Sequence, residues 1–219
     1  MDDLNKQAYW IWLSKIKGLG PRKSRNLLQY FKNAQGVWHA NIEELNKVPK
    51  IGPVLSSQII NSKQEFSPQQ EVEKLKKYQV KLVTLEDKCY PKLLKEIYDP
   101  PLVLYYKGSL VKFEKPCIAV VGTRSCSEYG KKIAYVLSKK LSAMGFVIVS
   151  GLARGIDTRA HQGALQTGMT YAILGSGLNH LYPPENKKLA AQISDQGAVI
   201  TPYPLEERPN KANFPARNR

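Results

Sequence analysis

Three short loops that contain glycine each follow an apolar, strand-like run in the C-terminal half of the sequence. They are Gly122-Thr123-Arg124-Ser125, Gly151-Leu152-Ala153-Arg154-Gly155 and Gly175-Ser176-Gly177. Glycine lets the backbone come close to a ligand, and amides that precede a helix point toward anions. Arg124 and Arg154 can each hold a phosphate through two hydrogen bonds. The loops therefore predict phosphate binding, although tight turns alone would also use glycines.

The sequence around these loops disfavours a cofactor and a catalytic site. The first loop does not read G-x-G-x-x-G, and no acidic residue ends the second strand where a ribose 2′-hydroxyl would be held. Asp157 and His161 could form a catalytic pair, but no nucleophile, metal ligand or second carboxylate lies at a spacing from them that is typical of a catalytic site. We expect Asp157 to cap its helix and bond loop amides, His161 to pack, and the protein not to be an enzyme.

The loops lie within a regular alternation of apolar runs and helix-length segments. The sequence predicts strands at 117–121, 146–150, 170–174 and 198–201, and helices near 127–144, 157–166 and 186–196. Continuous apolar strands separated by such helices are typical of a buried parallel sheet with right-handed crossovers. The predicted fold class is α/β with a Rossmann-like parallel sheet, whose carboxyl edge would bring the three loops into one crevice.

An internal repeat occupies the first part of the chain. Ile16-Lys17-Gly18-Leu19-Gly20-Pro21 recurs as Val48-Pro49-Lys50-Ile51-Gly52-Pro53. A glycine before a proline is expected to end one helix with a positive φ and to start the next, so each copy reads as a helix-hairpin-helix unit. We predict a small all-helical, SAM-like domain at 1–66 and an extended Rossmann-like domain at 67–219. The latter would begin with a linker at 67–70, a helix at 71–78 and strands at 80–84 and 102–106.

The role of the hairpins is open. Lys17, Arg22, Lys23 and Arg25 surround the first hairpin, whereas Lys50 is the sole charge at the second. Hairpin amides at helix N-termini can bind DNA phosphates, but such a module can also pack or contact another protein.

Charge and composition narrow the class of protein. The formal net charge is +15, which favours polyanionic partners through phosphate neutralisation and counterion release, although charge also serves solubility. Three cysteines lack metal-ligand spacing, and Cys117 lies in a strand expected to be buried; the three histidines are scattered, so we expect no metal site. The N-terminus is acidic and its apolar stretch is short. We therefore expect no signal peptide, no membrane partner and a cytoplasmic location.

The loops belong to a longer pattern that resembles the DNA-processing protein A (DprA/Smf) family. The matching segments are Val120-Val121-Gly122-Thr123-Arg124 with Tyr129-Gly130, Ser150 through Asp157 with Ala160-His161, Leu174 through Leu178, Tyr182-Pro183 with Asn186, and Phe214 through Arg219. The resemblance reaches back to Tyr90-Pro91. It implies a protein that binds single-stranded DNA, shields the incoming strand and loads the recombinase RecA in natural transformation and recombination.

The resemblance also implies a DNA site. By motif position its residues are Gly122, Thr123, Arg124, Ser125, Gly151, Arg154, Gly175, Ser176, Gly177, Lys211, Phe214, Arg217 and Arg219. Sequence-tolerant binding of a single strand needs a basic track and exposed aromatic faces, and stacking contributes roughly 1–3 kcal/mol per base. Phe214 could instead be a core residue, but its proline-rich, aperiodic setting between cations favours stacking.

The chain departs from the family pattern at its end. It stops at Arg219, where relatives continue with an apolar helix and more of the sheet, so we expect a C-terminally truncated chain. Family members generally form homodimers and contact RecA through those later elements. The strand at 199–201 would then have an exposed edge open to non-native pairing.

Two other functions stay open beside single-strand binding. A Rossmann-like enzyme that processes a nucleotide or nucleoside phosphate could use similar loops, but the Pro-Gly-Gly-x-Gly-Thr motif of that group is absent. A protein-interaction scaffold could use the helical repeats as its contact surface.

Overall fold

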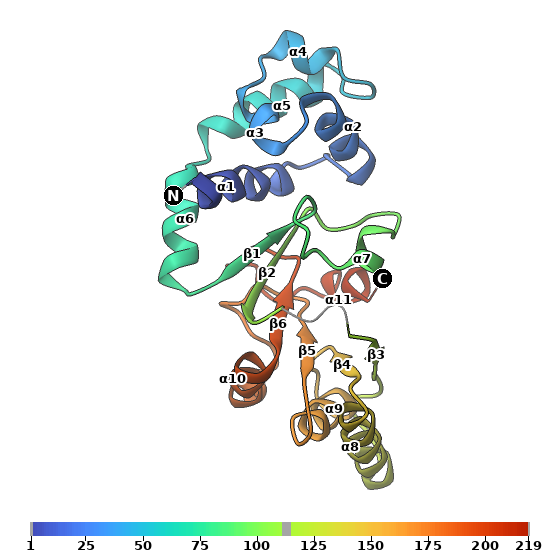
Figure 1. The fold of residues 1–219 in the computed structure, drawn as a ribbon. Coiled ribbons are helices and arrows are strands. Elements are labelled where there is room, and N and C mark those ends of the chain that lie inside the picture. Colours follow the sequence, from blue (N-terminus) through green and yellow to red (C-terminus); the bar gives the residue numbers. More distant parts are fainter. Residues whose placement is uncertain (1, 111–114, 219) are drawn as a thin grey trace. The chain divides into compact units, whose positions relative to one another are not determined.

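The chain divides into two compact units in a computed structural model that describes residues 2–110 and 115–218 (Figure 1). The units are Met1–Val103 and Leu104–Arg219. The predicted boundary after residue 66 lies inside the first unit, where helix α1 (Asp2–Lys15) contacts helix α6 (Pro68–Lys77) and strand β1 (Lys81–Thr84). Lys15 forms an ion pair with Glu71, and Gln7 donates to the Leu82 carbonyl oxygen. The boundary therefore stays a prediction.

The first unit is mostly helical. Its elements are α1 (Asp2–Lys15), α2 (Pro21–Phe31), α3 (Ala34–His39), α4 (Ile42–Asn46), α5 (Pro53–Gln64), α6 (Pro68–Lys77), β1 (Lys81–Thr84) and α7 (Lys92–Lys95). Trp12 and Leu27 are fully buried. The Trp12 indole donates to the Ser62 hydroxyl over 2.9 Å and meets Trp38 edge-on, with 5.0 Å between ring centroids. These contacts tie α1 to α3 and α5.

The two hairpins have the predicted sequence positions but a different backbone. The glycines before the prolines, Gly20 and Gly52, have φ of −73° and −93° and act as extended N-caps, with proline as the first helical residue. The positive φ lies two residues earlier, at Gly18 (77°) and Lys50 (67°). The prediction of a positive φ at Gly20 and Gly52 was wrong, because a residue that leads into a helix as its N-cap needs extended backbone.

The second unit is built on a mixed sheet. Its elements are β2 (Val103–Gly108), β3 (Cys117–Ala119), α8 (Glu128–Ala143), β4 (Val147–Ser150), α9 (Ile156–Ala164), β5 (Thr170–Ile173), the 3₁₀ helix η1 (Pro184–Asn186), α10 (Lys187–Gln196), β6 (Ala198–Thr201) and α11 (Asn213–Arg217). The strands lie in the order β2-β6-β5-β4-β3. Strands β3 to β6 are parallel, whereas β2 is antiparallel to β6. This confirms the α/β class.

The strand order corrects two expectations. The strand at 199–201 does not have a free edge: β6 lies between β2 and β5 and all four of its residues are buried. Instead β3 is the last strand of the order, and Cys117, expected in a buried strand, is exposed. An apolar run such as Cys117 to Val121 looks alike in the centre and at the border of a sheet, because its sequence does not report the number of neighbouring strands.

The helices after β3 and β4 pack closely on each other. Gly163 of α9 approaches α8 so tightly that a Cβ atom on it would lie 2.2 Å from the Tyr135 carbonyl oxygen. Buried Ile148, Ala160 and Ala164 form a core beneath this crossing. In the described part of the chain, no helix combines the length and the apolar character needed to cross a bilayer.

Candidate functional site

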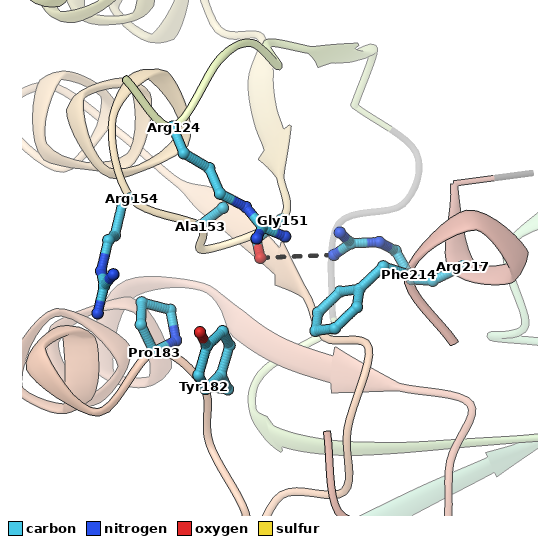
Figure 2. A pocket seen from close by; sticks show the side chains of 8 residues that line it. All are labelled: Arg124, Gly151, Ala153, Arg154, Tyr182, Pro183, Phe214 and Arg217. Carbon is cyan, nitrogen blue, oxygen red and sulfur yellow. Dashed lines mark hydrogen bonds between the residues drawn. The ribbon is translucent and has the colours of Figure 1, made fainter. Parts of the chain in front are cut away.

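The carboxyl ends of β3, β4 and β5 lie at one edge of the sheet, because these strands are parallel neighbours. A cavity of about 40 Å³ opens there, and Figure 2 shows the side chains around it. Its lining residues are Arg124, Gly151, Ala153, Arg154, Tyr182, Pro183, Phe214 and Arg217. The first two loops, the segment before η1 and helix α11 thus meet at this cavity.

Phe214 is the central side chain of the site. Its partly exposed ring lies against the third loop, where a Cβ atom on Gly175 would be 2.7 Å from the ring Cδ1 atom. The Arg124 guanidinium carbon lies 5.7 Å from the ring centroid, within the range of a cation–π contact. The Tyr182 ring is 6.3 Å away, centroid to centroid. The site therefore presents an aromatic ring next to an exposed cation (Figure 2).

The first loop is exposed and is held by its neighbours. The Ser125 amide donates to Thr123 Oγ1 over 3.2 Å, and the Thr123 hydroxyl donates to the Ser125 carbonyl oxygen. Gly122 packs on Ile156, and the Ile156 amide donates to the Thr123 carbonyl oxygen. The loop therefore places Arg124 from a fixed backbone while leaving its guanidinium accessible.

The second loop uses several of its amides internally. Buried Asp157 accepts hydrogen bonds through Oδ2 from the amides of Gly151 (3.1 Å) and Ala153 (3.4 Å). This confirms the expected bonding of loop amides by Asp157. The expectation that Asp157 caps its helix was wrong, because Gly155 is the N-cap residue of α9 and no side chain bonds there. The same bonds mean that the Gly151 and Ala153 amides already have an anionic partner, so this loop can offer a phosphate its arginine rather than these two amides.

Arg154 is exposed, but its charge is already paired. Its Nε atom donates to Glu185 Oε1. This hydrogen bond raises the pKa of Arg154 and lowers the pKa of Glu185. The free positive charge at the cavity therefore lies on the side of Arg124.

Arg217 holds helix α11 against the sheet. Its guanidinium donates to the carbonyl oxygen of Gly151, which directly follows β4, at 3.4 Å (Figure 2). It also donates to the carbonyl oxygen of Ile173, the last residue of β5. Burial lowers the pKa of Arg217, while the nearby Asp157 carboxylate opposes that shift. Arg217 thus positions Phe214 three residues earlier on the same short helix.

The third loop differs from the expectation that its amides face a ligand. Gly175, Ser176 and Gly177 are all buried. The Gly177 amide donates to the Glu207 carbonyl oxygen over 2.8 Å, and the Thr201 hydroxyl donates to the Ser176 carbonyl oxygen. This loop is covered because the segment before α11 folds over it. The Phe214 ring packs against Gly175 of this loop.

The remaining predicted cations lie apart from the cavity or outside the description. Lys211 is exposed in the turn before α11 and does not line the cavity, and Arg219 lies outside the described residues. Sequence reasoning did not assign Ala153, Tyr182, Pro183 or Glu185 to the site. The Tyr182-Pro183 dipeptide was part of the family pattern, and its place in a proline-rich loop after the third strand was the available signal.

His161 does not act together with Asp157. It is completely buried, and its Nδ1 atom lies 2.7 Å from Thr170 Oγ1. Because the Thr170 hydroxyl donates to the Ile148 carbonyl oxygen, Oγ1 accepts from His161 Nδ1–H. Desolvation lowers the pKa of His161 to about 3. This residue is therefore a neutral core histidine.

Comparison with known proteins gives a consistent set of relatives. A family model described as DNA recombination-mediator protein A matches residues 81–219. Protein Smf of Synechocystis is 39% identical over 98% of this chain and 55% of its own length. The X-ray structure of DNA processing protein A from Streptococcus pneumoniae aligns with a TM-score of 0.79 at 35% identity, over 96% of this chain and 72% of that one.

A second solved relative concerns DNA directly. DNA processing protein A of Helicobacter pylori, studied for its single-stranded DNA binding mode, aligns with a TM-score of 0.57 at 34% identity, over 63% of each chain. The present chain spans about half the length of the curated relatives that it matches.

Proposed function

Because the chain belongs to the DNA recombination-mediator protein A family, we propose that it binds single-stranded DNA at the carboxyl edge of its sheet. The observation that carries this proposal is the placement of Phe214, seated on Gly175 and flanked by the exposed Arg124. An aromatic face stacks on any base, and an arginine holds a phosphate, so the pair suits a strand of any sequence.

The size of the cavity supports a strand over a small nucleotide. A pocket that encloses a small molecule usually measures about 300–1,000 Å³. The cavity at Phe214 is about 40 Å³, well below that range. This favours a ligand that runs along the surface and counts against the nucleotide-processing enzyme.

The cation arrangement gives the DNA a preferred place. Arg124 has no carboxylate partner among the described residues, whereas Arg154 is neutralised by Glu185. We therefore expect a phosphate at Arg124, with the adjacent base on Phe214 and Tyr182 alongside. The exposed Lys211, in the turn before α11, extends the positive surface.

The wider role that we propose follows the family. The bound strand would be shielded and handed to RecA in recombination and natural transformation, in the cytoplasm, by a protein that forms a homodimer. We propose binding without chemistry on the DNA, since Asp157 and His161, the candidate catalytic pair, each have contacts that hold the fold.

Fluorescence anisotropy tests the proposal. A labelled thymidine oligonucleotide should bind, and deoxythymidine monophosphate should not compete at comparable concentration. Phe214→Ala should weaken binding by about 5- to 150-fold, the equivalent of one stacked base. Tyr98→Ala, which removes another exposed aromatic side chain, should have no effect. Preference for the mononucleotide would favour an enzyme, and binding of neither ligand would favour a protein-interaction scaffold.

A further inference from the structure

A second cationic recess lies where the first turns of α8 face α9. It measures about 310 Å³ and is lined by Glu128, Lys131, Lys132, Tyr135 and Arg159, which we call the α8–α9 patch. We infer that this patch is a second phosphate subsite, which carries the DNA strand onward from the Phe214 cavity. The inference rests on the proposed function and concerns residues outside the predicted site.

The charge of the patch favours an anionic ligand. Lys131 pairs with Glu128 over 2.6 Å, and Arg159 donates to the neutral Gln162 side chain over 3.0 Å. Lys132 is exposed and has no ion-pair partner in the described part of the chain. The hydrogen bond from Lys131 lowers the pKa of Glu128, so that carboxylate stays ionised at neutral pH. Three cations thus face one carboxylate, and two of the cations are not neutralised.

The patch is physically continuous with the loops of the candidate site. Ser127, two residues after the first loop, caps α8 by accepting from the Gly130 amide over 3.1 Å. Ile156, the first residue of α9, packs against both Gly122 of the first loop and Gly130 of α8. The Arg159 amide donates to the Gly155 carbonyl oxygen at the end of the second loop. The patch therefore begins within one helical turn of each arginine-bearing loop.

The chemistry of the patch suits a nucleotide. Tyr135 is a partly exposed aromatic side chain that lines the patch together with the cations of α8 and with Arg159 of α9. A basic track that carries an aromatic face is the arrangement by which proteins follow a single strand without reading its sequence. The ligand class is the sugar-phosphate backbone of an unpaired strand, with phosphates at Lys132 and Arg159.

The inference makes a length-dependent prediction. A thymidine dinucleotide should occupy only the Phe214 cavity, whereas an oligonucleotide of about 20 nucleotides should also reach the patch. Affinity falls as salt rises, so the slope of log affinity against log salt is negative. For the longer strand, Lys132→Ala and Arg159→Ala should each reduce the magnitude of this slope by about 0.7, and the double variant by about 1.4. Neither should change the slope for the short strand. Glu128→Gln should increase the magnitude of the slope for the longer strand.

Lys140→Ala is the matched control. Lys140 lies on the same helix and is also exposed, but it does not line the patch. The inference is supported if only the patch variants change the slope, and only for the longer strand. It is overturned if the longer strand binds every variant with the parent slope, if Lys140→Ala has an equal effect, or if short and long strands are affected alike. If the parent binds neither strand, the proposed function itself fails.

Discussion

The Phe214 ring lies against the backbone of Gly175, so close that a Cβ atom on this glycine would be 2.7 Å from the ring Cδ1 atom. The Arg124 guanidinium and the Tyr182 ring are the other neighbours of this ring, at 5.7 Å and 6.3 Å from its centroid. In the proposed function, the third glycine loop would therefore set the position of the stacking ring, although the Gly177 amide of the loop is already bonded to Glu207.

Gly175→Ala should weaken binding of single-stranded DNA almost as much as Phe214→Ala does, because the added methyl group displaces the ring. Gly175 is not among the residues with a positive φ, so the effect is steric rather than conformational. Gly52→Ala is the control, since a Cβ atom there meets nothing within 4 Å. Anisotropy titrations of the three variants would contradict this account if Gly175→Ala bound like the parent.

The two cavity arginines should differ in their salt dependence. Arg124→Ala should reduce the magnitude of the slope of log affinity against log salt by about 0.7, the value for one phosphate contact on a single strand. Arg154→Ala should lower it by less, because Glu185 already neutralises Arg154. Glu185→Gln should increase the magnitude of the slope, because Arg154 would then be free to contact a phosphate. Equal slopes for the two alanine variants would show that the Glu185 pair does not matter in solution.

Arg217 should behave as a positioning residue and not as a phosphate ligand. Arg217→Ala removes the donor to the Gly151 and Ile173 carbonyl oxygens. Because hydrogen bonds to charged groups contribute about 1.5–3 kcal/mol, the variant should lose stability of that order in urea unfolding. Its DNA affinity should also fall, with an unchanged salt slope. A slope reduced as in Arg124→Ala would instead place a phosphate at Arg217.

Stability should fall with acidification through His161. The pKa of His161 is lowered to about 3 in the folded protein, from an ordinary value near 6.5. The unfolded chain therefore binds a proton that the folded chain excludes. The contribution of His161 to stability is fully present above pH 6.5 and is lost as the pH falls toward 3. At pH 5 the loss should be about 2 kcal/mol relative to pH 7.

Urea unfolding of His161→Leu at both pH values checks this. The variant should lose about 2 kcal/mol less than the parent between pH 7 and pH 5. An undiminished pH dependence in His161→Leu would mean that other groups cause it.

The helical repeat predicts a stabilising substitution. Lys50 has a φ of 67°, where the first repeat has Gly18 at 77°. A left-handed backbone costs a non-glycine residue roughly 1 kcal/mol, so Lys50→Gly should raise the free energy of unfolding by up to that amount. Gly18→Lys should lower it. Urea unfolding that ranked the two variants in the reverse order would contradict the hairpin geometry.

The sheet could be predicted from sequence because its strands are apolar runs that alternate with helix-length segments. Every strand predicted from residue 117 onward is present within two residues of its expected bounds. The order of the strands was harder to predict, because β2 and β6 are far apart in the sequence and their pairing leaves no local sequence pattern. For that reason Cys117 and the strand at 199–201 were placed wrongly with respect to the sheet edge.

The site was predictable at the level of its loops but not of its contacts. The spacing of glycine and arginine placed Arg124 and Arg154 at one edge, and the family resemblance added Phe214; all three line the cavity. Nothing in the sequence indicated that Glu185 would pair with Arg154, or that Arg217 would be held by two carbonyl oxygens. Those partners come from segments far apart in the chain, so only the fold brings them together.

Stacking of a base on Phe214 is the central claim, and 2-aminopurine fluorescence tests it most directly. A single-stranded oligonucleotide with 2-aminopurine in place of one base should be quenched when the parent protein binds, because the probe loses emission when it stacks. Phe214→Ala, added to saturation, should leave the emission close to that of free DNA. Equal quenching by the parent and by Phe214→Ala would contradict the account.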